Sequence, residues 1–183
     1  MIYFTKGDLL ESKAQALVNT VNTVGVMGKG IALQFKEHFP QNYELYRSAC
    51  KSNHVKIGEM FTTVEHTLNG SKIIINFPTK TTWRRPSEYP YIEMGLKSLH
   101  EEIINRNIKS IAIPPLGSHN GGLDWSIIKT MMISALSDLD CDVIIYEPSD
   151  KIIEKLKRER IKLTPASSML LDVLCDMVAY GEF

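Results

Sequence analysis

Apolar positions along the chain fall into short strand-like runs separated by longer helix-like segments. The runs are rich in apolar and β-branched residues, and they predict strands at residues 2–4, 16–20, 60–64, 72–77, 110–114 and 143–146. The Asn69-Gly70 pair between the third and fourth runs is typical of a hairpin turn.

Between these runs, the spacing of apolar residues predicts helices over residues 31–38, 41–51 and 126–139, the last apolar on more than one side and therefore expected to pack deeply. A further helix is predicted from Ile92 to Ile103, where apolar residues recur every three or four positions and so share one face. Strands that alternate with such helices predict an α/β layer fold with a mostly parallel or mixed sheet.

Three polar or glycine-rich segments directly follow predicted strands. They begin after Thr20, after Phe77 and after Pro115. In α/β folds, ligands bind at the carboxyl ends of the strands. We therefore expect the three loops to converge at one edge of the sheet and to form one pocket.

The first loop carries Gly25, Gly28 and Gly30 in the order G-x-x-G-x-G. This is not the dinucleotide order G-x-G-x-x-G, and Lys29 is not followed by the Ser or Thr of a P-loop. Glycines nevertheless let the backbone approach a phosphate closely, and the helix predicted from Ile31 adds the positive end of its dipole. The loop is either an anion site or a tight turn before a helix.

The third loop, residues 114–125, is also rich in glycine and lies between a strand and a helix. Two amide-rich loops in one domain fit a diphosphate held from both sides. Between them lies a basic segment with Lys80, Trp83, Arg84 and Arg85. A lysine beyond a strand end is a candidate nucleophile when its pKa is lowered, and Trp83 offers a stacking face for a base. The alternative is an exposed basic turn.

The charge balance limits the kind of nucleic-acid partner. Among 183 residues, 21 Lys and Arg balance 21 Asp and Glu, so the formal net charge is zero. Proteins that coat nucleic acid usually carry a basic excess, because their affinity comes from neutralising phosphates. The sequence thus excludes a DNA-coating protein, while an anion site made of uncharged backbone amides remains compatible with it.

Metal, membrane and export signals are not found in the sequence. The three cysteines form no C-x-x-C pair and the five histidines show no metal-ligand spacing, so we expect no metal and no cofactor. No signal-peptide pattern and no apolar run of ~20 residues is present, which argues against export and membrane insertion. Together with the unpaired cysteines, this favours the cytoplasm.

Several motifs in a fixed order resemble those of a known family. They are residues 7–10 (GDLL), 16–22 (ALVNTVN), 25–31 (GVMGKGI) and 114–123 (PPLGSHNGGL). From residue 1 to about 147 the chain resembles a macro domain, the ADP-ribose-binding fold, which implies a three-layer α/β/α class with a mixed central sheet. Residues 76–80 with Trp83-Arg84, and Asn120-Gly121-Gly122-Leu123 with Trp125, most closely resemble the DNA ADP-ribosyl glycohydrolases, antitoxins of DarT-type toxins.

The resemblance implies a role for each matched position. Asp8 accepts from the adenine amino group, the amides of residues 117–121 hold the diphosphate, and Lys80 is the catalytic residue. The implied ADP-ribose-binding residues are Asp8, Leu9, Thr20, Val21, Asn22, Gly25, Val26, Met27, Gly28, Lys29, Gly30, Ile31, Ala32, Leu33, Gln34, Thr79, Gly117, Ser118, His119, Asn120 and Gly121. Trp83, Arg84 and Arg85 are candidate DNA contacts.

Two positions depart from the pattern of the family. A related glycohydrolase group pairs its lysine with an aspartate in the second loop, where this chain has Gly121. Lys80 would then act with substrate groups, with water or with another acid such as Asp124. Ser118-His119 stands where the antitoxin pattern more often has Cys-Gly.

The implied activity is removal of ADP-ribose from a base of DNA, with thymine in single strands as the expected base. The expected partners are therefore ADP-ribose, ADP-ribosylated single-stranded DNA and a DarT-type toxin. Three alternatives remain open: a reader that binds ADP-ribose without turnover, a hydrolase of ADP-ribose 1″-phosphate or O-acetyl-ADP-ribose, and neutralisation of a toxin by contact alone.

The chain changes character past Pro148. Residues 151–162 are strongly charged and predict a solvated helix, and residues 167–179 predict an apolar helix that needs a partner. We therefore divide the chain into a macro domain over residues 1–150 and a helical tail over residues 151–183. The resemblance implies that this tail opens a toxin-binding domain of which the rest is absent.

Overall fold

A computed structural model describes residues 1–67 and 70–148 of the chain. The predicted tail at 151–183 lies outside these residues, and the boundary at 150 stays a prediction. Within the described part, no helix is both long and apolar enough to cross a membrane.

The apolar runs form a six-stranded sheet in the order β1-β6-β5-β2-β4-β3. The strands are β1 (Ile2–Thr5), β2 (Ala16–Asn22), β3 (Phe61–Thr67), β4 (Gly70–Lys80), β5 (Ser110–Ile113) and β6 (Asp142–Tyr146). Neighbouring strands pair in parallel, except that β3 and β4 pair antiparallel. The sheet is therefore mixed, and the predicted hairpin between β3 and β4 is confirmed.

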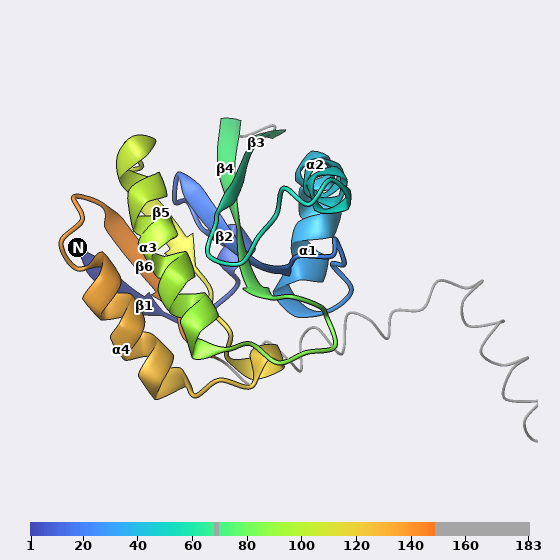
Figure 1. Cartoon of the computed structure of the whole chain (residues 1–183). Helices are drawn as coiled ribbons and strands as arrows, with labels where there is room; N and C mark the ends of the chain where they lie inside the picture. The colour runs from blue at the N-terminus through green and yellow to red at the C-terminus, as the bar shows by residue number, and fades with distance from the viewer. Residues whose placement is uncertain (68–69, 149–183) are drawn as a thin grey trace, which may run out of the picture. The chain divides into compact units, whose positions relative to one another are not determined.

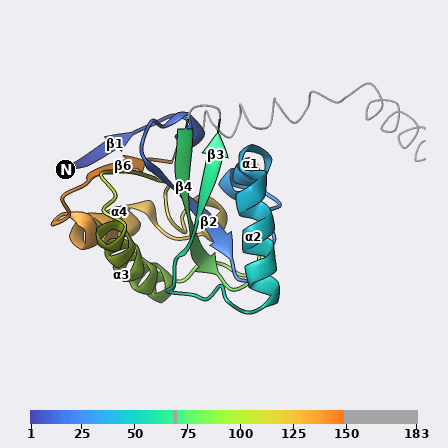
Figure 2. The ribbon, with the colours of Figure 1, turned by 90° about the horizontal axis from the view of Figure 1, so that it is seen from above.

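Two pairs of helices cover the two faces of this sheet. They are α1 (Gly30–His38), α2 (Pro40–Lys51), α3 (Tyr89–Asn105) and α4 (Trp125–Leu136), and two 3-10 turns, η1 (Leu9–Glu11) and η2 (His119–Gly121), lie in the loops. Helices α1 and α2 lie on one face, and α3 and α4 lie on the other (Figures 1 and 2). The predicted three-layer α/β/α class is confirmed.

The outer helices bury the faces that their apolar spacing predicts, with one difference. In α3, the side chains from Ile92 to Ile103 that share the predicted face are at most 2% exposed. In α4, Met132 is fully buried, but Ile127 is 48% and Ile133 39% exposed. The predicted deep packing therefore holds for one side of this helix, which faces the sheet and α3, and the apolar residues on its other side are exposed.

Strands β2 and β4 run further than the sequence predicts, and this places the functional residues. They are paired in parallel beyond Thr20 and Phe77 as far as Asn22 opposite Lys80, with a register shift after Val21. Lys80 is therefore the last residue of β4 and not a residue beyond its end. The polar residues at both ends hide the strand signal in the sequence.

A buried network of side-chain amides connects β2, β4 and α2. Asn19, Asn42 and Asn76 are all fully buried. Asn19 Nδ2 donates to Asn76 Oδ1 at 3.1 Å, and Asn76 Nδ2 donates to Asn42 Oδ1 at 2.7 Å. Thr63 of β3 also donates to Asn42 Oδ1, at 2.8 Å. Since a buried amide without partners is costly, the network favours one register of these elements.

The N-terminus of α2 is fixed by a side chain from β3. Its N-cap residue, Phe39, offers no side-chain hydrogen bond. The buried carboxylate of Glu65 accepts from Asn42 N at 2.8 Å and from Gln41 N at 3.4 Å instead. A carboxylate at this end also interacts favourably with the helix dipole. The position of α2 over the sheet is thus determined by polar contacts as well as by packing.

We expect Asn76→Leu to lower the free energy of unfolding by about 1–3 kcal/mol, because it leaves Asn19 Nδ2 and Asn42 Oδ1 without their Asn76 partner in the core. Urea unfolding measures the change. Asn105→Leu, at the exposed end of α3, makes the same substitution outside the network and should change stability little. Equal losses in both variants would contradict a special role for the network.

Candidate functional site

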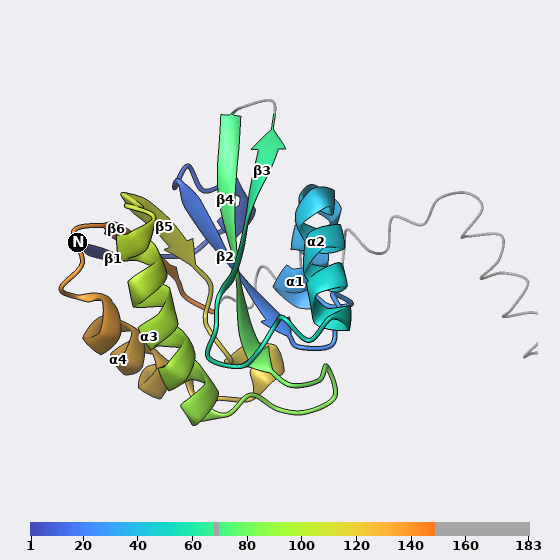
Figure 3. The ribbon, with the colours of Figure 1, turned by 45° about the horizontal axis from the view of Figure 1, so that its top comes forward.

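The three loops after β2, β4 and β5 are joined by hydrogen bonds. Thr23 donates to Thr81 O from its backbone nitrogen at 3.3 Å and from its hydroxyl at 2.9 Å. Ser87 N donates to Gly121 O at 2.9 Å, which joins the loop after β4 to η2. Figure 3 shows these two segments side by side below the sheet. The predicted convergence of the loops at one sheet edge is confirmed.

The glycine-rich loop after β2 is held in shape by Asn22 and Tyr46. Asn22 Nδ2 donates to Val26 O at 2.6 Å, and Asn22 Oδ1 accepts from Val24 N and Val26 N. Tyr46 of α2 donates its hydroxyl hydrogen to Asn22 O at 2.6 Å. Burial raises the pKa of Tyr46 well above its ordinary value, so the phenol stays a donor. The side chain of Asn22, which is in the implied ADP-ribose-binding set, thus holds the loop itself.

Two glycines in this loop have backbone conformations that other residues rarely adopt. Gly25 has φ +83° and lies against α2, where an added Cβ would be 3.3 Å from Cys50 Cβ. Gly30 has φ +59°, and an added Cβ would be 2.7 Å from the Nδ2 of Asn120 in the loop after β5. The end of the Asn120 side chain therefore occupies the space that a side chain at position 30 would need, which brings the two loops into contact here.

Helix α1 presents backbone amides at this close approach. Its N-cap residue, Lys29, makes no side-chain hydrogen bond to the first turn. The first amides of a helix have no partner within it, and together with the helix dipole they favour an anion. This end of α1 lies between the two amide-rich loops, where a diphosphate was expected.

The loop after β5 is compact and internally bonded. Ser118 donates from its hydroxyl to Pro115 O at 3.0 Å, and Gly121 N donates to Ser118 O at 3.3 Å. The amide of Gly121 is thus used within the loop, and not every amide of the predicted set is directed at a ligand. The positive φ values of the loop lie at Gly117 and Gly122, so glycine occupies both strained positions.

Lys80 lies where the three loops meet. Its Nζ donates to the backbone oxygen of Asn120, across from β4 to η2. Partial burial lowers the pKa of Lys80 below its ordinary value. Within the described residues it forms no ion pair with a carboxylate. A lowered pKa increases the fraction of neutral amine, the form of lysine that acts as a nucleophile.

Position 121, where a related glycohydrolase group has an aspartate, is a glycine in this chain. A Cβ at Gly121 would be 2.6 Å from Ser87 Oγ and 3.1 Å from Ser87 Cβ, so Ser87 fills the space of a side chain there. Ser87 is 4% exposed, and its hydroxyl has no partner among the described residues. Asp124, the other acid considered, accepts from Ser126 N at 2.8 Å and caps α4.

The remaining predicted residues fall into buried, half-buried and exposed groups. Leu9, Val21, Met27, Ala32 and Thr79 are buried. Thr20, Ile31, Leu33 and Gln34 are half-buried, while Val26, Gly28 and Lys29 are exposed. Asp8 accepts from Leu10 N at 3.0 Å and caps η1, which fixes the direction of its carboxylate.

The candidate DNA contacts lie on the exposed part of the loop after β4. Trp83 is 54% exposed, and the Arg84 guanidinium stacks on its ring, 4.6 Å from the centroid. Arg85 is exposed beside them. An aromatic ring and two cations a few residues after Lys80 form a surface suited to a base and its phosphate.

Two residues that support the site were missed from the sequence. Tyr46 lies one helical turn from both Asn42 and Cys50, and the three form the buried stripe of α2. Their i, i+4, i+8 spacing within residues 41–51 is a signal that would have identified the stripe. Ser87 has no comparable signal, because its place beside Gly121 depends on the path of two loops.

The fold and the loops define an α/β domain in which two amide-rich loops and a lysine meet at the carboxyl ends of β2, β4 and β5, an arrangement suited to an anionic ligand. The model of the family "Macro domain" matches residues 18–132. The macrodomain of Mycobacterium tuberculosis DarG has 53% sequence identity and a TM-score of 0.79 over 81% of this chain and 99% of that one. The chain belongs to the macro domain family.

Two further comparisons concern longer proteins. The DNA ADP-ribosyl glycohydrolase of Mycobacterium tuberculosis is 48% identical over 177 residues, which are 95% of this chain and 50% of that protein. The structure of Thermosipho africanus DarTG in complex with ADP-ribose has 37% identity and a TM-score of 0.76, over 80% of this chain and 41% of that one. The chain spans about half the length of the curated relatives that it matches first.

We expect Gly121→Ala to lower the free energy of unfolding by about 1–3 kcal/mol, because the new methyl group overlaps Ser87. The double variant Gly121→Ala/Ser87→Gly removes both overlapping atoms and should recover part of this loss. Urea unfolding of the two single variants and the double variant measures the coupling. Strictly additive effects would show that the two residues do not press on each other.

Proposed function

We propose that this chain hydrolyses the bond between ADP-ribose and a base of DNA. The observation that carries the proposal is the position of Lys80, a half-buried lysine of lowered pKa at the junction of three loops. Two of these loops are rich in glycine and amides. The relatives named DNA ADP-ribosyl glycohydrolase, 46–48% identical to this chain, support this substrate class.

The proposed binding mode uses the loops as amide donors. The diphosphate lies beside the N-terminus of α1 and the loop after β5. The adenine lies toward Asp8, and the distal ribose lies toward Thr79 and Lys80. The ligand charge is then neutralised by dipoles that the fold has already oriented, and the chain needs no basic excess.

In the proposed reaction, the neutral amine of Lys80 attacks the anomeric carbon of the distal ribose. The bond from this carbon to the base nitrogen breaks, and the proton released from the attacking nitrogen passes to the base. Water then replaces the lysine at the anomeric carbon, which regenerates the amine. The products are an unmodified base and free ADP-ribose, and the reaction is a net hydrolysis.

The substrate we propose is ADP-ribosylated single-stranded DNA, with thymine as the modified base. The stacked pair of Trp83 and Arg84 supports a contact with an unpaired neighbouring base. The proposed biological partner is a DarT-type toxin whose modification the chain reverses, and the proposed setting is the cytoplasm. The likeness to the Thermosipho africanus DarTG supports this partner.

One observation favours a second function. No acid lies at Gly121, and Asp124 caps a helix. A site without a partner acid for Lys80 fits a reader that binds ADP-ribose without turnover. Small-molecule hydrolysis, of ADP-ribose 1″-phosphate or O-acetyl-ADP-ribose, uses the same binding loops, and these compounds serve as comparison substrates.

We expect Lys80→Ala to lower the rate of ADP-ribose release from an ADP-ribosylated thymidine oligonucleotide by about 100-fold or more, because it removes the attacking group. Release is followed by chromatography of the oligonucleotide, and calorimetry with free ADP-ribose should show that binding persists. Equal release by wild type and variant would disprove the role of Lys80. Binding without release in the wild type would favour the reader.

The pH dependence of the reaction follows from the lowered pKa of Lys80. Only the neutral amine attacks, so the rate should rise with pH and level off above the pKa of Lys80, below the ordinary pKa of lysine. Initial rates between about pH 6 and pH 10 measure the profile. Lys80→Arg stays charged throughout and should show no such rise. A rate that falls as pH rises would instead favour a protonated Lys80 that assists electrostatically.

A further inference from the structure

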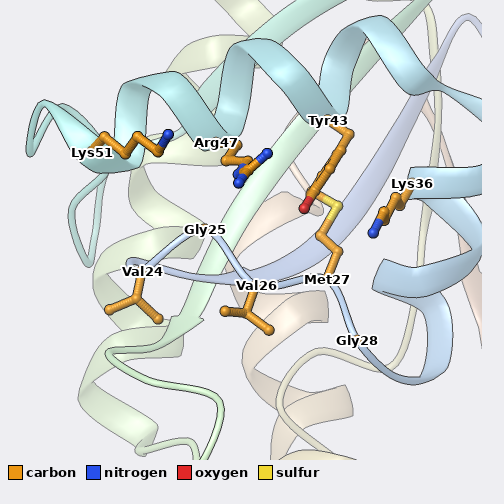
Figure 4. A pocket seen from close by; sticks show the side chains of 9 residues that line it. All are labelled: Val24, Gly25, Val26, Met27, Gly28, Lys36, Tyr43, Arg47 and Lys51. Atoms are coloured by element: carbon orange, nitrogen blue, oxygen red, sulfur yellow. The ribbon is translucent and has the colours of Figure 1, made fainter.

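A pocket lies on the α2 side of the glycine-rich loop, and the α1 and α2 side chains that line it have no role in the proposed reaction (Figure 4). It has a volume of about 320 Å³. Residues 24–28 of the loop form one wall, and Lys36 of α1 with Tyr43, Arg47 and Lys51 of α2 forms the other. We call it the α2 basic pocket.

The α2 basic pocket concentrates positive charge in a chain of zero net charge. Tyr43, Arg47 and Lys51 are spaced four residues apart and share one face of α2. None of the residues that line the pocket is acidic, and in the described part of the chain its three cations make no ion pair. Lys36 Nζ lies over the Tyr43 ring, 4.7 Å from its centroid.

The pocket and the Lys80 site share the glycine-rich loop as a common wall. Gly25 packs against α2, where an added Cβ would lie 3.7 Å from Arg47 Cα. The start of the same loop is bonded to Thr81, the residue after Lys80, through Thr23. Val24 and Val26 are exposed and point away from α2 (Figure 4). On the α2 side of the loop, Met27 points toward Tyr43, and the three cations line the pocket beside them (Figure 4).

We propose that the α2 basic pocket binds phosphates of the single strand that carries the modified base. The inference rests on the proposed function, because a substrate attached to DNA brings backbone phosphates to the edge of the loop. Arg47 and Lys51 lie one helical turn apart, about 6 Å along the axis, so they can contact different phosphates of one strand. Mobile Lys and Arg side chains hold phosphates without reading the sequence.

The test compares two triple variants of equal charge. Lys36→Gln/Arg47→Gln/Lys51→Gln removes the three cations of the pocket. Lys97→Gln/Arg106→Gln/Lys109→Gln removes the same formal charge from exposed cations on α3 and the residues after it, on the other face of the sheet. Glutamine retains a polar side chain in both variants. The control also removes the ion pairs of Arg106 with Glu102 and of Lys109 with Asp140, but exposed pairs of this kind contribute little to stability, so it mainly shows the effect of net charge.

Binding is measured by fluorescence anisotropy with a labelled twelve-residue oligothymidylate over a range of salt concentrations. The pocket variant should bind roughly tenfold more weakly than the wild type at low salt. The slope of log affinity against log salt concentration should also be less steep by about 2, because each phosphate contact on a single strand contributes ~0.7 and three contacts are lost. The control variant should keep the wild-type slope. Equal losses in both variants, or a wild-type protein with no salt-dependent binding, would overturn the proposal.

Cleavage assays separate this proposal from the proposed function. The pocket variant should lose kcat/KM toward an ADP-ribosylated oligonucleotide by a factor similar to its loss of affinity, and should hydrolyse ADP-ribosylated thymidine nucleoside at the wild-type rate. If the pocket variant loses kcat/KM toward the nucleoside by the same factor, the cations act only by supporting the loop, and the proposal is overturned. If the wild type cleaves neither substrate, the proposed function fails, while the anisotropy comparison still decides the pocket.

Discussion

The buried pairing of Asn19, Asn76 and Asn42 is the constraint on which the site depends. Side chains alternate between the two faces of a strand, so a slip of one residue between β2 and β4 would turn Lys80 to the other face of the sheet. Apolar contacts alone tolerate such a slip better than buried amides, each of which loses its partners when the register changes. The network therefore fixes the position of Lys80 from within the core, four residues before the strand ends.

The same network also fixes the glycine-rich loop, because it includes α2. Asn42 and Tyr46 lie on the buried stripe of this helix; the first bonds to β4, and the second bonds to the backbone oxygen of Asn22. Asn22 in turn holds the loop through Val24 and Val26. The amides of Val24 and Val26 are used by Asn22, and the rest of the loop backbone is thus held in one shape before any ligand arrives. Preorganised dipoles of this kind interact with an anion without the reorganisation that water requires.

Much of this arrangement could be predicted from the sequence, because it follows from periodicity and chain direction. The strands, the helices and the meeting of three loops at one edge all follow from apolar spacing and from parallel pairing. The true ends of β2 and β4 could not be predicted, because Asn22 and Lys80 are polar and resemble loop residues. The contact of Ser87 with Gly121 could not be predicted either, because it depends on tertiary packing between two irregular segments. The roles assigned to individual site residues remain predictions.

A chain of zero net charge can contact anions in two ways, through backbone amides and through cationic side chains. Backbone amides at α1 and the loop after β5 have a fixed geometry, so they favour one diphosphate shape and depend weakly on salt. Lys36, Arg47 and Lys51 are flexible charges that accept any phosphate and depend strongly on salt. A protein that must find a rare modification benefits from this separation, because strong general affinity would hold it on unmodified DNA. If both proposals hold, a chain of balanced charge with a small cationic pocket would bind unmodified strands weakly and the modified base specifically.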